Sequence, residues 1–333
     1  MTMRYRLFGP TGLRVSELAL GTMVLDDPRE WRRILDTYAD AGGNVLDTAS
    51  AYGEGESTLG TVLGRRDRFV IGTKYTLSRD AKDPNAAGNH RKNLVLSLER
   101  SLRRLRTDYI DIYWVHIWDR HTPVEETMRA LDDAVCAGKI LHIGISDTPA
   151  WVVARANTLA QWRDRTPFAG LQVPYNLLKR DIERELLPMA EAFGLSVTTW
   201  APLARGVLSG AADAPAGAPG PSRFDPATLT ARERAAAGAV RTVADELGAH
   251  PAQVAIAWTR GKSAAILPIV GVRSAAQLTE NLGAVELTLP EDAIRHLEDA
   301  VEFDPGFPSD FIAQCEPDPF VFGDAATKVD ARR

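Results

Sequence analysis

An aspartate and a tyrosine five residues apart follow a short apolar run, and a lysine and a histidine end two later apolar runs. These residues are Asp47, Tyr52, Lys74 and His116. An acid, a phenol, an ammonium and an imidazole can together deliver a proton to a carbonyl oxygen. A free tyrosine has a pKa of about 10, too high for this task, and a nearby ammonium favours the phenolate. We therefore expect Lys74 to lower the pKa of Tyr52, Asp47 to hold Lys74, and His116 to orient the carbonyl.

Each of these residues has a simpler explanation when it is taken alone. A histidine at a strand end is usually a packed or rim residue, and a lysine there usually faces solvent. The set is what favours a catalytic site, because four complementary groups stand at or just beyond the ends of successive apolar runs.

Short apolar runs alternate with amphipathic segments along the chain, after an opening hairpin with its turn at residues 9–12. The runs predict eight strands, at residues 17–23, 44–49, 69–74, 109–116, 140–146, 168–175, 195–200 and 264–270. The other segments predict helices at residues 30–41, 57–63, 93–106, 124–137, 149–162, 182–193, 231–247, 251–260, 274–282 and 290–302. This alternation predicts an α/β fold, a (β/α)8 TIM barrel with an N-terminal β-hairpin and a C-terminal tail. We expect one domain over residues 1–333.

Further polar and aromatic residues stand near the expected C-terminal ends of the strands, where the active sites of such barrels lie. They are Ser146, Gln172, Tyr175 and Trp200.

Two regions interrupt the pattern of alternating strands and helices. Residues 209–226, rich in Ala, Pro and Gly, predict a mobile lid or a disordered insertion, and the tail at 303–333 shows no periodicity.

The composition excludes several classes of function. A net charge of −5 without a dense run of Lys and Arg argues against nucleic acid as a partner. Two cysteines in unrelated surroundings predict neither a metal site nor a disulfide framework. The longest apolar stretch, residues 264–272, is too short to span a membrane, and a signal peptide is not recognisable, so we expect a cytoplasmic protein. The chain also lacks a Rossmann fingerprint, a P-loop and the Gly-x-Ser-x-Gly motif of hydrolases.

The motifs around these residues resemble those of the aldo-keto reductases, in the broad bacterial branch that includes the potassium-channel β subunits. The family signature Asp-Thr-Ala-x-x-Tyr-Gly stands at residues 47–53, the lysine ends Gly-Thr-Lys at 72–74, and the histidine ends residues 108–116. Further matches are Ile-Gly-Ile-Ser at 143–146, Gln-Val-Pro-Tyr-Asn at 172–176, and the segments 200–206 and 268–273. The resemblance covers about residues 4–302. It implies a (β/α)8 barrel, NADPH as the cofactor and reversible reduction of a carbonyl.

The resemblance also implies roles for the matching residues. Tyr52 would be the general acid, assisted by Asp47, Lys74 and His116. The nicotinamide carboxamide would be held by Ser146 and Gln172, and Trp200 would stack on the nicotinamide ring. Leu203, Arg205 and Gly206 would line the pyrophosphate path, in a segment whose Ala201 and Pro202 are also expected at the cofactor. The residues expected at the adenosine end are Gly271, Arg273, Gln277, Glu280 and Asn281, with Arg273 suited to the 2′-phosphate of NADPH.

One position departs from the family pattern. Many members have Asn after the serine that stands here as Ser146, whereas this chain has Asp147. An Asn can donate a hydrogen bond to the carboxamide oxygen, but an ionised Asp can only accept one from the carboxamide NH2. Asp147 therefore puts this one contact with the cofactor in doubt.

The substrate pocket is expected to come from the loops after the strands. Met23, Tyr75 and Trp118 lie near strand ends and are expected to form an apolar, aromatic wall for an aldehyde or ketone. The chain would act as a monomer or a small homo-oligomer.

Two alternatives to a carbonyl reductase stay open: a cofactor-binding sensor or regulatory partner subunit with little turnover, and a barrel isomerase or aldolase with Lys74 as a Schiff base. The second alternative leaves Tyr52 and Trp200 without a role.

Overall fold

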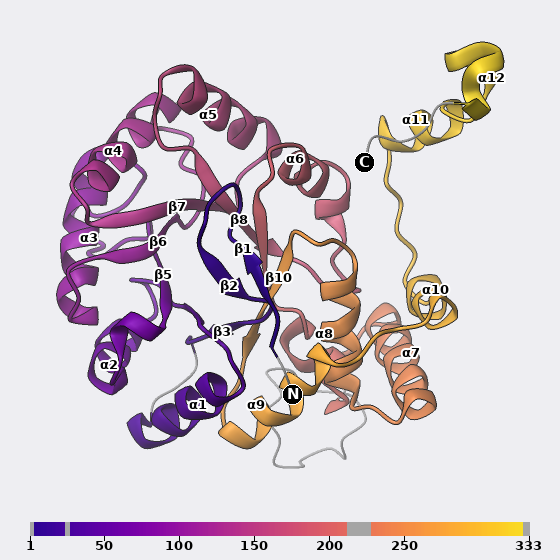
Figure 1. Ribbon diagram of the computed structural model, residues 1–333, viewed down its shortest axis with the longest axis horizontal. Helices are drawn as coiled ribbons and strands as arrows, with labels where there is room; N and C mark the ends of the chain where they lie inside the picture. Colours follow the sequence, from indigo (N-terminus) through magenta and orange to yellow (C-terminus); the bar gives the residue numbers. More distant parts are fainter. Residues whose placement is uncertain (1–2, 24–26, 212–227, 329–333) are drawn as a thin grey trace.

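A closed barrel of eight parallel strands forms the centre of the computed structural model, which describes residues 3–23, 27–211 and 228–328 (Figure 1). The strands are β3 (Ala19–Gly21), β4 (Val45–Asp47), β5 (Val70–Tyr75), β6 (Ile110–Val115), β7 (Ile140–Ser146), β8 (Phe168–Pro174), β9 (Ser196–Trp200) and β10 (Ile266–Gly271). They follow one another in sequence order around the barrel, and β10 pairs with β3 to close it. Because both faces of each strand are covered, the strands are nearly continuous apolar runs, and this is why the sequence revealed all eight.

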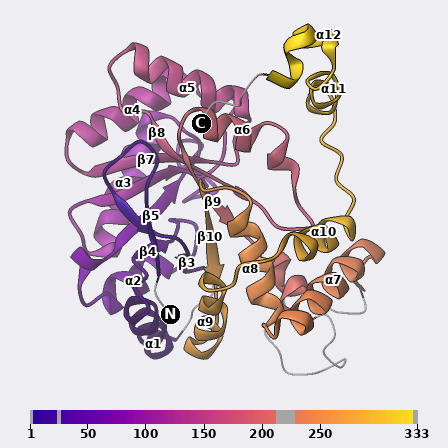
Figure 2. The same cartoon turned by 45° about the vertical axis from the view of Figure 1, so that its right-hand side comes forward.

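Helices surround the barrel in Figures 1 and 2. They are α1 (Pro28–Asp40), α2 (Gly55–Val62), α3 (Arg91–Leu105), α4 (Val124–Cys136), α5 (Ala150–Trp162), α6 (Leu186–Ala192), α7 (Ala231–Leu247), α8 (Pro251–Gly261), α9 (Ala275–Leu282) and α10 (Glu291–Asp299). Short 3-10 helices lie at Arg66–Arg68, Asp181–Glu183, Ala204–Ser209 and Gly283–Val285. The predicted helix at 182–193 is therefore divided in two. Pro188 explains the break, because its ring would clash with the carbonyl of Arg184 if α6 extended further back.

The N-terminal hairpin, β1 (Tyr5–Leu7) and β2 (Arg14–Ser16), packs against the end of the barrel at which the strands begin. Phe8 is fully buried, and its ring meets the Trp114 ring edge-on inside the barrel, with 6.1 Å between centroids. Gly144 makes room for this indole, because a Cβ there would lie 2.3 Å from a Trp114 ring carbon. The hairpin thus closes one end, and the end that carries the C-terminal ends of the strands remains for a ligand.

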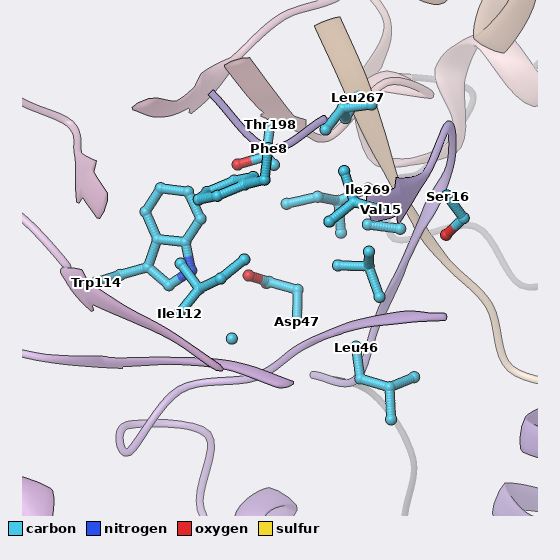
Figure 3. A pocket seen from close by; sticks show the side chains of 13 residues that line it. Phe8, Val15, Ser16, Leu46, Asp47, Ile112, Trp114, Thr198, Leu267 and Ile269 are labelled. Atoms are coloured by element: carbon cyan, nitrogen blue, oxygen red, sulfur yellow. The ribbon is translucent and has the colours of Figure 1, made fainter. Parts of the chain in front are cut away.

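Figure 3 shows side chains that line the small space left inside the barrel between this closed end and Asp47. Phe8, Trp114, Thr198 and Leu267 are among the residues that line a remaining cavity of about 10 Å³. That volume is about what a single water molecule requires, so the interior is a packed core rather than a channel.

The C-terminal tail contains short helices, which the sequence did not predict. They are α11 (Ser309–Cys315), α12 (Pro319–Phe322) and a 3-10 helix at Gly323–Lys328. Both cartoon views show α11 and α12 standing away from the barrel (Figures 1 and 2). Seven and four residues are too few for a helical period to emerge from the sequence, and this explains the miss. Most of the predicted insertion at 209–226 lies outside the described residues. Within the described ranges, no helix is long and apolar enough to cross a bilayer.

Candidate active site

Asp47 and Lys74 form a buried ion pair at the C-terminal end of the barrel. Asp47 is the last residue of β4, and Lys74 lies in the neighbouring strand β5. Lys74 Nζ donates to Asp47 Oδ2 at 2.7 Å and to the carbonyl oxygen of Thr48 at 2.8 Å. Only 1% of Lys74 is exposed. Burying two charges is costly unless each is paired and hydrogen-bonded, so this geometry fixes the ammonium in one place.

The second oxygen of Asp47 is held from across the barrel. Gln172, in β8, donates from Nε2 to Asp47 Oδ1 at 2.9 Å and to Thr198 Oγ1 in β9 at 3.2 Å. The sequence assigned Gln172 to the cofactor and did not predict this contact. The amide nitrogen of Gln172 is thus engaged with Asp47, and its oxygen can accept a hydrogen bond. A carboxamide NH2 group, which donates, would bind to that oxygen.

Tyr52 lies against both Lys74 and His116. Lys74 Nζ is 5.2 Å from the centroid of the Tyr52 ring, and the His116 ring meets the Tyr52 ring edge-on at 6.1 Å. Burial raises the pKa of Tyr52, Lys74 lowers it, and the pKa ends above its ordinary value. Lys74 thus lowers the pKa of Tyr52, as expected, but desolvation of the phenolate outweighs the neighbouring ammonium. Tyr52 consequently carries its proton at neutral pH.

His116, just beyond β6, is a neutral imidazole. Burial, assisted by the charge of Lys74, lowers its pKa from 6.5 to about 4. Its Nδ1 is buried and has no hydrogen-bond partner among the described residues. A neutral imidazole has one N–H donor and one acceptor nitrogen, so His116 can donate a hydrogen bond to a carbonyl oxygen without bringing a charge.

The low pKa of His116 predicts a loss of stability on acidification. Between pH 6.5 and about 4 the unfolded chain binds a proton at this position and the folded chain does not. The free energy of unfolding therefore falls as the pH falls through this window and is unaffected by this group above it. His116→Gln cannot bind the proton, so we expect its stability to fall less between pH 7.5 and 4.5 in urea unfolding. Equal losses in both proteins would contradict a neutral, buried His116.

Ser146, Asp147 and Trp200 lie together beside this group. Ser146 ends β7 and is buried, and Trp200 ends β9 with 39% of its surface exposed. Trp200 Nε1 donates to Asp147 Oδ1 at 3.3 Å, and this contact holds the indole at the mouth of the barrel. Desolvation raises the pKa of Asp147, although Trp200, Lys74 and Lys179 oppose that rise. An exposed, anchored indole is suited to stack on a ligand rather than to fill the core.

The segment after β9 has an unusual backbone. Ala201, Ala204 and Arg205 have φ values of +55°, +46° and +61°, and Gly206 has +106°. Such conformations are strained for residues with a Cβ and are concentrated at functional sites. Asn176 holds the start of the segment by donating to the Ala201 carbonyl at 2.9 Å. Pro202 is buried and Leu203 half-buried, so the segment also packs on the barrel.

The residues predicted for the adenosine lie between the end of β10 and the end of α9. Gly271 ends β10 and, like Arg273, is exposed; the backbone N–H of Arg273 donates to Gln277 Oε1 at 2.9 Å. Glu280 pairs with His250 at 3.2 Å. Only 1% of Asn281 is exposed, and neither its amide nitrogen nor its oxygen has a partner in the described part of the chain. A buried amide without partners is rare in native proteins, so Asn281 has free capacity for a ligand.

One residue near this site was not found from the sequence. Glu30, in α1, accepts from the backbone N–H of Ala275 at 2.8 Å, at the first residue of α9. A contact between segments so far apart has no local sequence signal. It places a carboxylate at the helix end where the sequence predicted a phosphate.

Of the three residues predicted for the aromatic wall, Tyr75 does not face the opening of the barrel, whereas Met23 and Trp118 remain candidates. Trp118 is half-buried and meets Trp151, in α5, edge-on at 5.7 Å, while Met23 is 51% exposed beyond β3. Tyr75 is fully buried and stacks on Tyr113 at 5.3 Å, so its assignment to the pocket was wrong. Successive side chains of a strand point to opposite faces, and since Lys74 points into the barrel, Tyr75 must point toward the helices. Trp151, the partner of Trp118, was not among the residues expected from the sequence.

A metal ion would need a group of side chains that could bind it in the described part of the chain. Within residues 3–23, 27–211 and 228–328 there is no group of three or more His, Cys, Asp and Glu side chains placed to hold an ion. The structure thus brings together Asp47, Tyr52, Lys74 and His116, with Ser146, Asp147, Gln172 and Trp200 beside them.

Residues 17–302 match the Aldo/keto reductase family. The norsolorinic acid reductase stcV of Emericella nidulans is 39% identical to the chain, over 92% of the chain and 84% of that protein. The aldo-keto reductase ausK of the same organism is 37% identical over 92% and 84%. The aryl-alcohol dehydrogenase [NADP(+)] of Phanerodontia chrysosporium is 36% identical over 92% and 88%. These fungal relatives do not support the narrower resemblance to the bacterial branch with the channel β subunits. The extent of the match and of these identities shows that the chain belongs to the aldo/keto reductase family.

Proposed function

We propose that the protein reduces an aldehyde or ketone to an alcohol with NADPH, and that Tyr52 donates the proton to the carbonyl oxygen. The observation that carries the proposal is the group formed by Asp47, Lys74, Tyr52 and His116 at the open end of the barrel. Each member contributes a different property: Asp47 a carboxylate that fixes the ammonium of Lys74, Tyr52 a protonated phenol beside that ammonium, and His116 a neutral imidazole against the phenol ring.

The chemistry follows from the state of each group. Tyr52 holds its proton at neutral pH because burial raises its pKa. His116, neutral because its pKa is about 4, donates a hydrogen bond that positions the carbonyl oxygen near the phenol. As Tyr52 gives up its proton, Lys74 stabilises the phenolate that forms, and Asp47 holds Lys74 in place.

The described residues fit a nicotinamide dinucleotide. When bound, NADPH supplies the hydride that reaches the carbonyl carbon. Ser146, the Gln172 oxygen and Asp147 would hold the carboxamide, and the exposed Trp200 would cover the ring. The strained segment with Ala201, Pro202, Leu203, Arg205 and Gly206 would follow the pyrophosphate, and Gly271, Arg273, Gln277, Glu280 and Asn281 would hold the adenosine. The unpartnered amide of Asn281 supports this fit, as does the NADP(+) in the name of one relative.

We propose an aromatic carbonyl as the preferred substrate class. Trp118 and Trp151 both follow C-terminal strand ends, so their edge-on pair stands on the same side of the barrel as His116. A flat aromatic group can stack on an indole, which adds to the energy of burial alone. One relative is named an aryl-alcohol dehydrogenase, which is in keeping with this class. The single domain, a monomeric or small homo-oligomeric state and a cytoplasmic location remain predictions of the sequence.

Replacing Arg273 tests the assignment of the 2′-phosphate. We expect Arg273→Ala to weaken NADPH binding by about tenfold to a hundredfold, the range that the loss of a charge-assisted hydrogen bond allows, and to leave NADH binding unchanged. Dissociation constants from quenching of tryptophan fluorescence would measure both cofactors. Equal weakening of NADPH and NADH would show that Arg273 does not contact the phosphate.

A variant of Glu30 should change NADPH binding in the opposite direction to Arg273→Ala. Its carboxylate accepts from the Ala275 N–H near the proposed phosphate, and a glutamine keeps an acceptor oxygen without the charge. Glu30→Gln should therefore strengthen NADPH binding severalfold relative to NADH, because like charges no longer meet.

The proposed function is tested by following NADPH oxidation at the nicotinamide absorbance with a panel of aromatic and aliphatic aldehydes and ketones. Turnover on aromatic members, at rates well above those of size-matched aliphatic ones, is the expected result. Tight binding of NADPH without turnover on any compound would replace the reductase with a cofactor-binding sensor. Borohydride trapping of Lys74 with a carbonyl compound would instead indicate Schiff-base chemistry.

A further inference from the structure

A buried side chain outside the proposed catalytic group spans the backbone on both sides of His116. Asn89, in the loop between β5 and α3, is almost fully buried. Its Oδ1 accepts from Thr76 Oγ1 at 2.7 Å, and the same Thr76 oxygen accepts from the backbone N–H of His116 at 3.2 Å. Its Nδ2 donates to the carbonyl oxygen of Ile117 at 3.1 Å. The Asn89 amide thus holds the backbone on both sides of the imidazole, directly at the Ile117 carbonyl and through Thr76 at the His116 N–H.

Asn89 is itself fixed by its own backbone. Its N–H donates to Asp119 Oδ2 at 3.0 Å, and its carbonyl accepts from Tyr75 at 3.2 Å. Desolvation would raise the pKa of Asp119, but hydrogen bonds from Thr122, Asn89 and His121 hold it below its ordinary value. This carboxylate therefore remains ionised at neutral pH and is a strong acceptor. The buried Tyr75, which is not part of the substrate pocket, has its role in this network.

Thr76 occupies a conformation that a residue of its type rarely adopts. Its φ is +96°, and it is a buried, β-branched residue directly after β5. Such a position costs about 1–3 kcal/mol and persists only where the surroundings impose it. Here the strain turns the hydroxyl so that it can meet both Asn89 and the backbone of His116.

The imidazole is partly buried, and it meets the Tyr52 ring edge-on. Its Nδ1 has no hydrogen-bond partner in the described ranges, so a hydrogen bond at this atom does not fix the ring. The backbone to which the ring is attached therefore has a large part in setting its position. A displacement of about 1 Å in a group that orients a substrate can reduce the rate by about a hundredfold.

We propose that Thr76 and Asn89 are positioning residues for His116: their hydrogen bonds to the backbone N–H of His116 and the carbonyl oxygen of Ile117 set where the imidazole meets the substrate carbonyl. This inference rests on the proposed function, since it assigns His116 the task of orienting that carbonyl. It adds to that function two residues outside the group of Asp47, Tyr52, Lys74 and His116 that act on His116 through its backbone.

Variants of Thr76 separate the hydroxyl from the shape and the strain. Thr76→Val keeps the branched shape and loses the hydroxyl, Thr76→Ser keeps the hydroxyl, and Thr76→Gly loses the hydroxyl while it relieves the strained φ. We expect kcat to fall by about tenfold to a hundredfold in the valine and glycine variants, with the KM for NADPH within about twofold, and the serine variant to recover most of the rate. The glycine variant guards against a valine variant that fails to fold.

The same substitutions in a His116→Ala background decide whether the effect passes through the imidazole. If it does, Thr76→Val lowers kcat by less than about twofold there, because the group that it positions is gone. An equal loss in both backgrounds, or a lower Tm with kcat unchanged, would overturn the proposal and leave the network a merely structural role.

A measurement without turnover separates this inference from the proposed function. NMR titration of the histidine rings, with His116→Ala as the assignment control, follows the His116 pKa directly. A ring released toward solvent in Thr76→Val would titrate closer to 6.5 than the value of about 4 in the wild type. An unchanged titration would count against positioning even in an active enzyme. A wild type that reduces no carbonyl would refute the proposed function while the titration still tests the network.

Discussion

We expect Tyr52→Phe to lower kcat for carbonyl reduction by about 10²–10⁴-fold, the contribution of a positioned general acid. The substitution removes one hydroxyl and keeps the ring that lies against Lys74 and His116. Binding of NADPH should therefore remain within about twofold of the wild type. Single-turnover oxidation of bound NADPH, with an aromatic aldehyde in excess, measures the chemical step itself.

The pH dependence provides an independent check on the same residue. Because burial raises the pKa of Tyr52, the proton required for reduction is present throughout the neutral range. The rate of reduction should be level around pH 7 and fall only at alkaline pH, whereas oxidation of the alcohol, which needs the phenolate, should rise with pH. In Tyr52→Phe we expect both features to disappear: the fall of the reduction rate at alkaline pH and the rise of the oxidation rate with pH. A residual rate within tenfold of the wild type, with an unchanged profile, would identify another proton donor.

The barrel and the four central residues were predictable because their signals are local. A strand buried on both faces is a continuous apolar run, and a polar residue that ends such a run stands out. In a parallel barrel all strand ends meet at one opening, so Asp47, Lys74 and His116 could be placed together before their contacts were known. Tyr52 was already a candidate proton donor because of its phenol, and the family resemblance independently implied the same role.

What could not be predicted depends on long-range packing. The bond from Gln172 to Asp47 joins residues 125 positions apart, and Glu30 reaches α9 from α1. The net pKa shift of Tyr52 required the extent of its burial, which a list of neighbouring charges does not contain. The error at Tyr75 was different in kind, because the alternation of side chains along a strand was available from the sequence once Lys74 was assigned to the interior.

Lys74→Met should affect both activity and stability. The methionine has a similar length and no charge, so it leaves the Asp47 carboxylate buried without its counter-ion. Breaking a buried ion pair from one side typically lowers the free energy of unfolding by about 3–5 kcal/mol. The rate should fall as well, because the phenolate that forms at Tyr52 loses the cation that stabilises it. Urea unfolding and single-turnover reduction would measure the two effects.

The double variant Asp47→Asn/Lys74→Met separates the two effects. It removes the unpaired charge, and the asparagine oxygen can still accept from Gln172, which donates to Asp47 Oδ1 at 2.9 Å. Much of the lost stability should therefore return, since replacing both members of a buried pair is far less harmful than removing one. Activity should not return, because the ammonium beside Tyr52 is still absent. Recovery of both would show that Lys74 acts only in folding, whereas recovery of stability alone would assign the ammonium to the proton transfer at Tyr52.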